Sequence, residues 1–213
     1  PCKIDHVISN KDCSAVFLAR DNNIKTNVLH WNSKLESREE YDARLVSLVK
    51  NVTKNTDNHI IVLAGWMHIL SETFTSKFPN ILNLHPALPG QFDGSPDAIN
   101  DAFKLYQEGK RDGFGIMTHR VTKNVDQGEL ISSMHVDTLP DQLSNDEFRA
   151  SLRLYEKGCL IQGVLNLINI MNIKRIEKLQ SQDPIDINPY FGKVRTVRDM
   201  GNGELLLTAS DKL

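Results

Sequence analysis

The stretch that decides the fold is Asn83-Leu84-His85-Pro86-Ala87-Leu88-Pro89-Gly90. It continues the apolar run Ile81-Leu82, and a stronger apolar run lies upstream at 60–65. Both runs are short and bounded, which is typical of strands buried in an open α/β sheet. In such sheets, ligands bind outside the carboxyl ends of the strands. Asn83 and His85 stand two positions apart at one such end, so we expect their side chains to share a face.

The side chains at this strand end suit acyl transfer. An amide that donates a hydrogen bond and an imidazole that titrates near neutrality can together stabilise a developing oxyanion. Asp126 precedes a glycine-containing turn and can supply a carboxylate that orients the imidazole. Taken singly, Asn83 also fits a turn cap, His85 a hydrogen-bonded core histidine and Asp126 a turn-forming residue.

Composition narrows the range of partners. The chain has 213 residues, enough for one domain or one domain plus part of another. Its 25 basic and 27 acidic residues leave a net charge of -2, which argues against nucleic acid or a membrane surface as a partner. Cys2, Cys13 and Cys159 lack metal-ligand spacing. We therefore predict no metal and a reduced, cytoplasmic location. No apolar run is long enough to span a membrane, and the first residues do not resemble a signal peptide.

Strand-like and helix-like segments alternate along most of the chain. We predict strands at 6–10, 25–31, 59–65, 81–85, 115–121 and 130–136. Helices are expected at 12–22, 71–78 and 144–172, and two more are expected to begin at Ser37 and Ser95. The link between the last two strands is too short for a crossover helix, so that pair should be antiparallel. The fold class is α/β, with a doubly wound, mostly parallel sheet and an antiparallel pair near its C-terminal part.

Three helix starts carry recognisable capping signals. Ser37 with Glu40 and Ser144 with Glu147 have the spacing of a capping box. Ser95, followed by proline, is expected to cap the helix that begins there. Beyond these helices the composition changes. We predict a main domain over 1–173, a polar linker over 174–189 and the opening hairpin of a second domain over 190–213.

Four separated blocks make the chain resemble the phosphoribosylglycinamide formyltransferase family. The blocks are Leu63-Ala64-Gly65-Trp66-Met67-His68-Ile69-Leu70, Asn83 to Gly90, His119-Arg120-Val121 and Val125-Asp126-Gln127-Gly128. The resemblance spans roughly 7–171, with the blocks in family order. It implies the formyltransferase fold and transfer of a formyl group from 10-formyltetrahydrofolate to the amine of glycinamide ribonucleotide, a step of purine biosynthesis.

The same resemblance implies roles for individual residues. Asn83, His85 and Asp126 match the family's catalytic residues. The residues that match the folate pocket are Met67, His68, Ile69, Leu70, Val121, Thr122 and Val125. The residues that match the ribonucleotide site are Pro86, Gly94, Arg153 and Glu156. His68 stands where many relatives carry arginine, so contact of its side chain with the folate glutamate does not follow from the match.

Each of these residues also has a plainer interpretation. Apolar side chains such as Met67, Ile69 and Leu70 belong more often to a core than to a ligand pocket. Arg153 and Glu156 stand three positions apart on a predicted helix, where they could form a surface ion pair. Gly94 could simply permit a tight turn before the next helix.

The chain departs from the family pattern at both ends. The family opens with a strand and a glycine-serine-asparagine loop that binds phosphate, but no glycine precedes Gly65 here. We therefore expect the chain to be a segment that lacks its natural N-terminal strand. At the other end, 190–195 and 205–213 resemble the opening of SAICAR synthetase, which suggests that the parent polypeptide is fused to another purine-pathway enzyme.

Three alternative functions stay open. Formyltetrahydrofolate hydrolase and methionyl-tRNA formyltransferase share the asparagine, histidine and aspartate pattern. Ala87 and the segment Phe92-Asp93-Gly94, without a basic tail, favour the ribonucleotide enzyme. A non-catalytic folate-binding segment is the remaining alternative.

Overall fold

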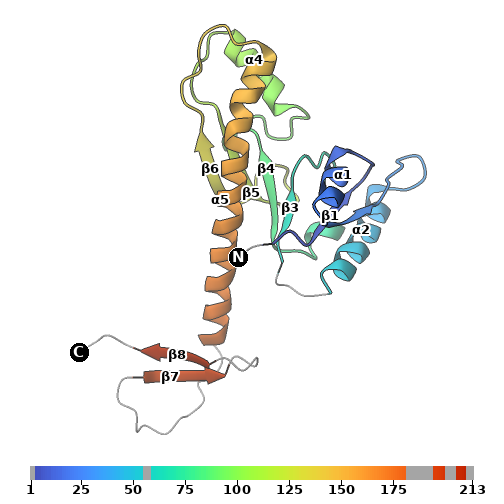
Figure 1. Cartoon of the computed structure of the whole chain (residues 1–213), viewed down its shortest axis with the longest axis vertical. Helices are drawn as coiled ribbons and strands as arrows, with labels where there is room; N and C mark the ends of the chain where they lie inside the picture. Colours follow the sequence, from blue (N-terminus) through green and yellow to red (C-terminus); the bar gives the residue numbers. More distant parts are fainter. Residues whose placement is uncertain (1–2, 55–58, 181–193, 200–204, 210–213) are drawn as a thin grey trace. The chain divides into compact units, whose positions relative to one another are not determined.

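The computed structural model describes residues 3–54, 59–180, 194–199 and 205–209 (Figure 1). The chain divides into two compact units, Pro1–Val164 and Leu165–Leu213. The first unit contains, in order, β1 (His6–Ser9), α1 (Ser14–Asp21), β2 (Lys25–Val28), α2 (Arg38–Val52), β3 (Ile61–Leu63), α3 (Glu72–Thr75), β4 (Ile81–His85), α4 (Ala98–Gln107), β5 (Gly115–Arg120), β6 (Leu130–His135) and the start of α5 (Asn145–Gln180). The predicted alternation of strands and helices is confirmed.

The described strands of the first unit form two sheets. β1 pairs with β2 in parallel, and a second sheet has the order β3-β4-β5-β6. In this second sheet β3 and β4 are parallel, whereas β5 is antiparallel to both β4 and β6. The α/β class with parallel strands and an antiparallel β5–β6 pair is therefore confirmed. The antiparallel β4–β5 pairing was not predicted, because side-chain periodicity is the same in both pairing directions.

The helix starts follow their capping signals with one exception. The Ser37–Glu40 capping box is complete, and Ser144 and Glu147 exchange the corresponding hydrogen bonds. For α4, however, the cap is Asp97, whose Oδ1 accepts the backbone N–H of Asn100 at 3.1 Å. The prediction of Ser95 as the cap was wrong. A carboxylate is favoured at the positive end of the helix dipole, and Ser95 instead donates to Asp101.

The main core lies between α4, β5 and α5. Phe148 of α5 is fully buried, and its ring packs against the rings of Phe103, Tyr106 and Phe114 at centroid distances of 5.3–5.4 Å. On β5, Ile116 faces this cluster. Because side chains alternate along a strand, the neighbouring residues of β5 face the opposite side of the sheet, where the candidate site lies.

Phe148→Ala should lower the free energy of unfolding by about 3–5 kcal/mol, because it leaves a cavity in this packed cluster. Phe17→Ala is the matched control, since the Phe17 side chain is 56% exposed on α1. Urea unfolding of the two variants beside the wild type tests this. Equal losses for the two substitutions would contradict the assignment of the core.

In the second unit, α5 continues to Gln180 rather than ending near Asn172. The first part of the predicted linker, 174–180, is therefore helical, because no proline or glycine interrupts this stretch. β7 (Val194–Asp199) and β8 (Leu205–Ala209) pair antiparallel, as the predicted hairpin requires. The rest of the predicted linker and the turn of the hairpin lie outside the described residues.

Candidate active site

The candidate site is built where β4 ends. Asn83 and His85 project from the same face of β4, and the antiparallel register places them opposite His119 and Met117 of β5. Asp126 comes from the loop between β5 and β6. Its φ of 56° lies in the left-handed region, which aspartate tolerates better than most residues. This backbone turn brings a carboxylate to the end of two strands that are distant in sequence.

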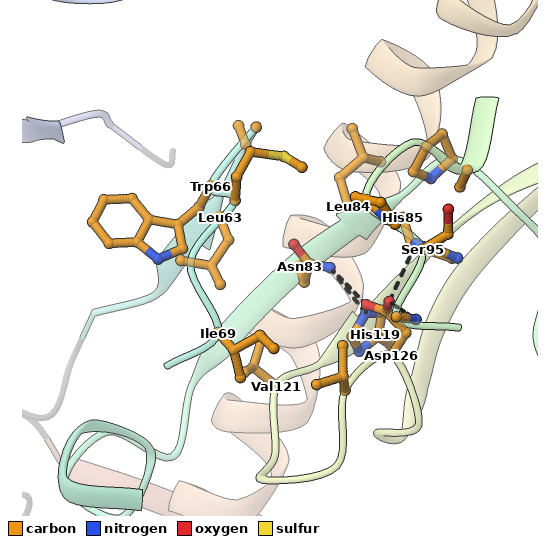
Figure 2. A pocket seen from close by; sticks show the side chains of 18 of the residues that line it. Leu63, Trp66, Ile69, Asn83, Leu84, His85, Ser95, His119, Val121 and Asp126 are labelled. Carbon is orange, nitrogen blue, oxygen red and sulfur yellow. Dashed lines mark hydrogen bonds and ion pairs between the residues drawn. The ribbon is translucent and has the colours of Figure 1, made fainter. Parts of the chain in front are cut away.

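Asp126 is the centre of the polar cluster (Figure 2). Its Oδ1 lies 3.3 Å from Asn83 Nδ2 and 3.3 Å from His119 Nε2. Its Oδ2 accepts the backbone N–H of Gly94 at 2.9 Å and lies 3.6 Å from His85 Nδ1. The carboxylate therefore holds together two strands, its own loop and the loop that carries Gly94.

These contacts lower the pKa of the Asp126 carboxyl to about 2. The largest cause is the hydrogen bond from His119, and the backbone N–H of Gly94 and the charge of His85 act in the same direction. Burial of the carboxyl opposes them, since burial disfavours the charged form. The Asp126 carboxyl is therefore ionised throughout the neutral range.

This shift gives a stability prediction. The folded-state pKa of Asp126, about 2, is below its ordinary value of 3.8, so its ionised form stabilises the fold above pH 3.8. That contribution should be lost as the pH falls from 3.8 toward 2. Asp126→Asn lacks this carboxyl and keeps all the others, so the difference in unfolding free energy between wild type and variant isolates the contribution of Asp126. Measured between pH 2 and 6, that difference should shrink as the pH falls from 3.8 toward 2. A difference independent of pH would contradict it.

The imidazole of His85 is buried, with 4% of the residue exposed. Its Nε2 lies 3.0 Å from the backbone carbonyl of Gln91, so this nitrogen carries a proton and donates it. Its Nδ1 faces Asp126, but 3.6 Å is too long for a hydrogen bond. The two groups attract as charges when the imidazole is protonated, and a protonated imidazole at this position can stabilise an oxyanion.

A cavity of about 660 Å³ adjoins this cluster. All the residues that the sequence assigned to the site line it, namely Met67, His68, Ile69, Leu70, Asn83, His85, Pro86, Gly94, Val121, Thr122, Val125, Asp126, Arg153 and Glu156. Their individual roles remain predictions. The volume lies within the range of small-molecule sites in general.

The residues on the predicted folate side differ in exposure. Met67 is 69% exposed and Ile69 47%, so both are accessible at the cavity, whereas Leu70 is buried in the core beside α2 and α3. The His68 ring packs edge-on against Trp31, with centroids 4.5 Å apart, and its Nε2 contacts Asn10. Burial, the largest cause, lowers the pKa of His68. This environment favours a neutral ring over one that binds a carboxylate.

Arg153 and Glu156, on the predicted ribonucleotide side, both line the cavity from α5. In the part of the chain that the structure describes, no ion pair joins one to the other. The plainer interpretation of this pair as a surface salt bridge therefore finds no support. A guanidinium that faces the cavity is suited to an anionic group such as phosphate.

Sequence reasoning missed His119 as a member of the cluster. It lay inside a family block but was given no role. Its place in the site follows from the pairing of β4 with β5, which puts His119 opposite Asn83. No pattern in a single sequence encodes that register. Across the described ranges, no three His, Cys, Asp or Glu residues are placed to hold a metal ion. No described helix is long and apolar enough to cross a membrane.

Comparisons with known proteins agree with this geometry. Phosphoribosylglycinamide formyltransferase of Dictyostelium discoideum is 38% identical over 154 residues, covering 67% of this chain and 74% of that protein. The enzyme of the same name from Saccharomyces cerevisiae is 32% identical over 174 residues, covering 76% and 81%. The crystal structure of phosphoribosylglycinamide formyltransferase from Streptococcus pneumoniae TIGR4 superposes with a TM-score of 0.66 at 28% identity, covering 76% of this chain and 86% of that one.

A longer relative bears on domain arrangement. The trifunctional purine biosynthetic protein adenosine-3 of Gallus gallus is 32% identical over 170 residues, which are 74% of this chain but 16% of that protein. The model of the formyl transferase family matches residues 2–164, the part that carries every residue of the site. The chain therefore belongs to the formyl transferase family.

Proposed function

We propose that the chain transfers the formyl group of 10-formyltetrahydrofolate to the amine of glycinamide ribonucleotide. The observation that carries the proposal is the cluster of Asn83, His85 and Asp126 beside a cavity of about 660 Å³. Relatives named for this reaction match most of the chain's length, and a solved structure of the same name shares its fold. The chain is a formyltransferase, and small molecules are its substrates.

The proposed reaction needs stabilisation of an oxyanion and transfer of a proton, and the three residues can provide both. The substrate amine attacks the formyl carbon, forming a C–N bond and an oxyanion, and the bond from carbon to the folate nitrogen then breaks. Asn83 and protonated His85 can donate to the oxyanion, and each such donor is typically worth about 100-fold or more in rate. Asp126 lies beside His85 as its counter-charge and assists the transfer of a proton from the attacking amine to the leaving nitrogen.

In the proposed arrangement both substrates occupy the cavity described above. The folate lies along Met67, His68, Ile69 and Leu70, with Val121, Thr122 and Val125 on the loop that faces them. The ribonucleotide lies along Pro86 and Gly94, with its phosphate toward Arg153 and its ribose or amide toward Glu156. Only the formyl donor is needed as co-substrate, and the proposed chemistry needs no metal.

An assay of folate release with and without glycinamide ribonucleotide tests the proposal. The formyltransferase should release tetrahydrofolate only when the ribonucleotide is present, and formylated ribonucleotide should accumulate in equal amount. Release of formate and tetrahydrofolate without the ribonucleotide would indicate the hydrolase. Folate binding without turnover, unchanged by His85→Ala, would indicate a non-catalytic binding segment.

We also propose that β7 and β8 begin a second domain joined to the formyltransferase, in a cytoplasmic protein with reduced cysteines. Support comes from their antiparallel pairing, from the unit boundary at Val164 and from the trifunctional relative. The sequence of the complete transcript tests this. A reading frame that stops soon after Leu213 would contradict it.

A further inference from the structure

The amide of Asn83 is turned the wrong way for the role that the proposed function gives it. Its Nδ2 lies 3.3 Å from Asp126 Oδ1 and 3.1 Å from His119 Nε2. Figure 2 shows the amide nitrogen pointing to these two groups and the carbonyl oxygen pointing away from them. An amide nitrogen has two hydrogens, so in this orientation one can go to Asp126 Oδ1 and the other to His119 Nε2 whenever that nitrogen carries no proton. An oxyanion in the cavity would meet the Asn83 carbonyl instead of an N–H.

Transfer therefore requires the amide to rotate by half a turn about its last side-chain bond. The rotated amide presents its N–H groups to the cavity, but it places its carbonyl oxygen beside Asp126 Oδ1, where the nitrogen now lies. Two oxygens that only accept hydrogen bonds repel each other at such a distance unless a donor lies between them. The cluster must supply that donor from another residue.

His119 is placed to be this donor. Its side chain is 3% exposed, and its Nε2 lies 3.3 Å from Asp126 Oδ1 and 3.1 Å from the end of the Asn83 amide. Its other nitrogen, Nδ1, lies 3.1 Å from the backbone carbonyl of Arg120 and donates to it, which leaves Nε2 to face Asp126 and Asn83. A proton on Nε2 can thus be shared between Asp126 and the rotated Asn83 carbonyl.

We propose that His119 is a positioning residue that sets the orientation of the Asn83 amide. With Nε2 protonated, the imidazole donates to the Asn83 carbonyl and turns the amide N–H groups toward the formyl oxygen. Without that proton, Nε2 accepts from the amide nitrogen, and the N–H groups stay inside the cluster. The inference rests on the proposed function, since it assigns Asn83 the oxyanion.

Removal of the His119 ring should lower kcat mainly by changing the orientation of Asn83, and less by changing Asp126. The carboxylate of Asp126 keeps contacts with Gly94 and His85 when the His119 ring is removed. The rotated Asn83 amide, in contrast, loses the donor that separates its oxygen from the carboxylate. His119→Leu should therefore lock Asn83 in its present orientation and lower kcat about as much as Asn83→Ala does, roughly 100- to 1,000-fold, with little change in KM.

A double-mutant cycle on formyl transfer tests this. Adding His119→Leu to Asn83→Ala should cost almost nothing further in kcat, because the orientation of a missing amide no longer matters. His119→Gln, which keeps an N–H near the Nε2 position, should recover most of the lost rate. His135→Leu on β6 is the control, since His135 is exposed and outside the site.

The outcomes separate the possibilities. Additive losses in the His119 and Asn83 cycle, or coupling of His119 to Asp126→Asn instead, would overturn the inference. The circular dichroism spectrum and urea midpoint show whether His119→Leu folds. If it does not, the same double-mutant cycle is measured with His119→Gln, which keeps a donor near the Nε2 position, and with His119→Asn, which does not. A wild type that shows no transfer would overturn the proposed function and this inference together.

Discussion

His85→Ala should lower kcat for formyl transfer by about 100- to 10,000-fold, the usual range for a positioned acid or base, and should leave KM within a few-fold. The reason is that His85 contacts Asp126 and the Gln91 carbonyl from inside the cluster, so its loss removes transition-state stabilisation more than substrate contact area. Steady-state kinetics with both substrates varied, beside an unfolding curve, measure the two effects separately.

Two comparisons sharpen that result. His135→Ala changes an exposed histidine on the neighbouring strand β6, so its kcat should match the wild type. Asp126→Asn should also lower kcat strongly, and the double variant with His85→Ala should be little worse than either single variant, because the two side chains act as a unit. A His85→Ala enzyme with unchanged kcat would remove this histidine from the mechanism.

Gly128→Ala should have the second large effect, on both stability and rate. A Cβ atom at Gly128 would lie 1.6 Å from the backbone carbonyl oxygen of Arg120, a distance that no side-chain adjustment can relieve. The loop after Asp126 must then move away from β5, at a cost of about 1–3 kcal/mol or more. Because this loop carries Asp126, kcat should fall as well, even though Gly128 does not line the cavity.

Gly158→Ala is the matched control for this substitution. There the new Cβ would lie 3.2 Å from the Met134 sulfur, which belongs to a flexible side chain, and Gly158 lies within α5, where alanine is favoured over glycine. Urea midpoints and kcat for the two variants should differ clearly. Wild-type stability and rate in Gly128→Ala would show that the β5–β6 loop does not hold Asp126 through this close contact.

The sequence determined most of the local structure. The order of strands and helices and the two capping boxes were predicted, because each depends on residues close together in the chain. The residues around the cavity were predicted as well, because the family blocks mark the strand ends and loops that meet there. What a run of neighbouring residues encodes can be derived from the chain alone.

The tertiary structure decided the rest. The direction of β5 against β4, and with it the pairing of Asn83 with His119, depends on backbone register between distant segments, which side-chain periodicity does not record. The contact of Gly94 with Asp126 likewise joins two loops that only the folded chain brings together. The sequence therefore predicts which side chains carry the chemistry. The fold decided which of them touch, and so the charge on Asp126 and the orientation of Asn83, because hydrogen bonds act only over a few ångströms.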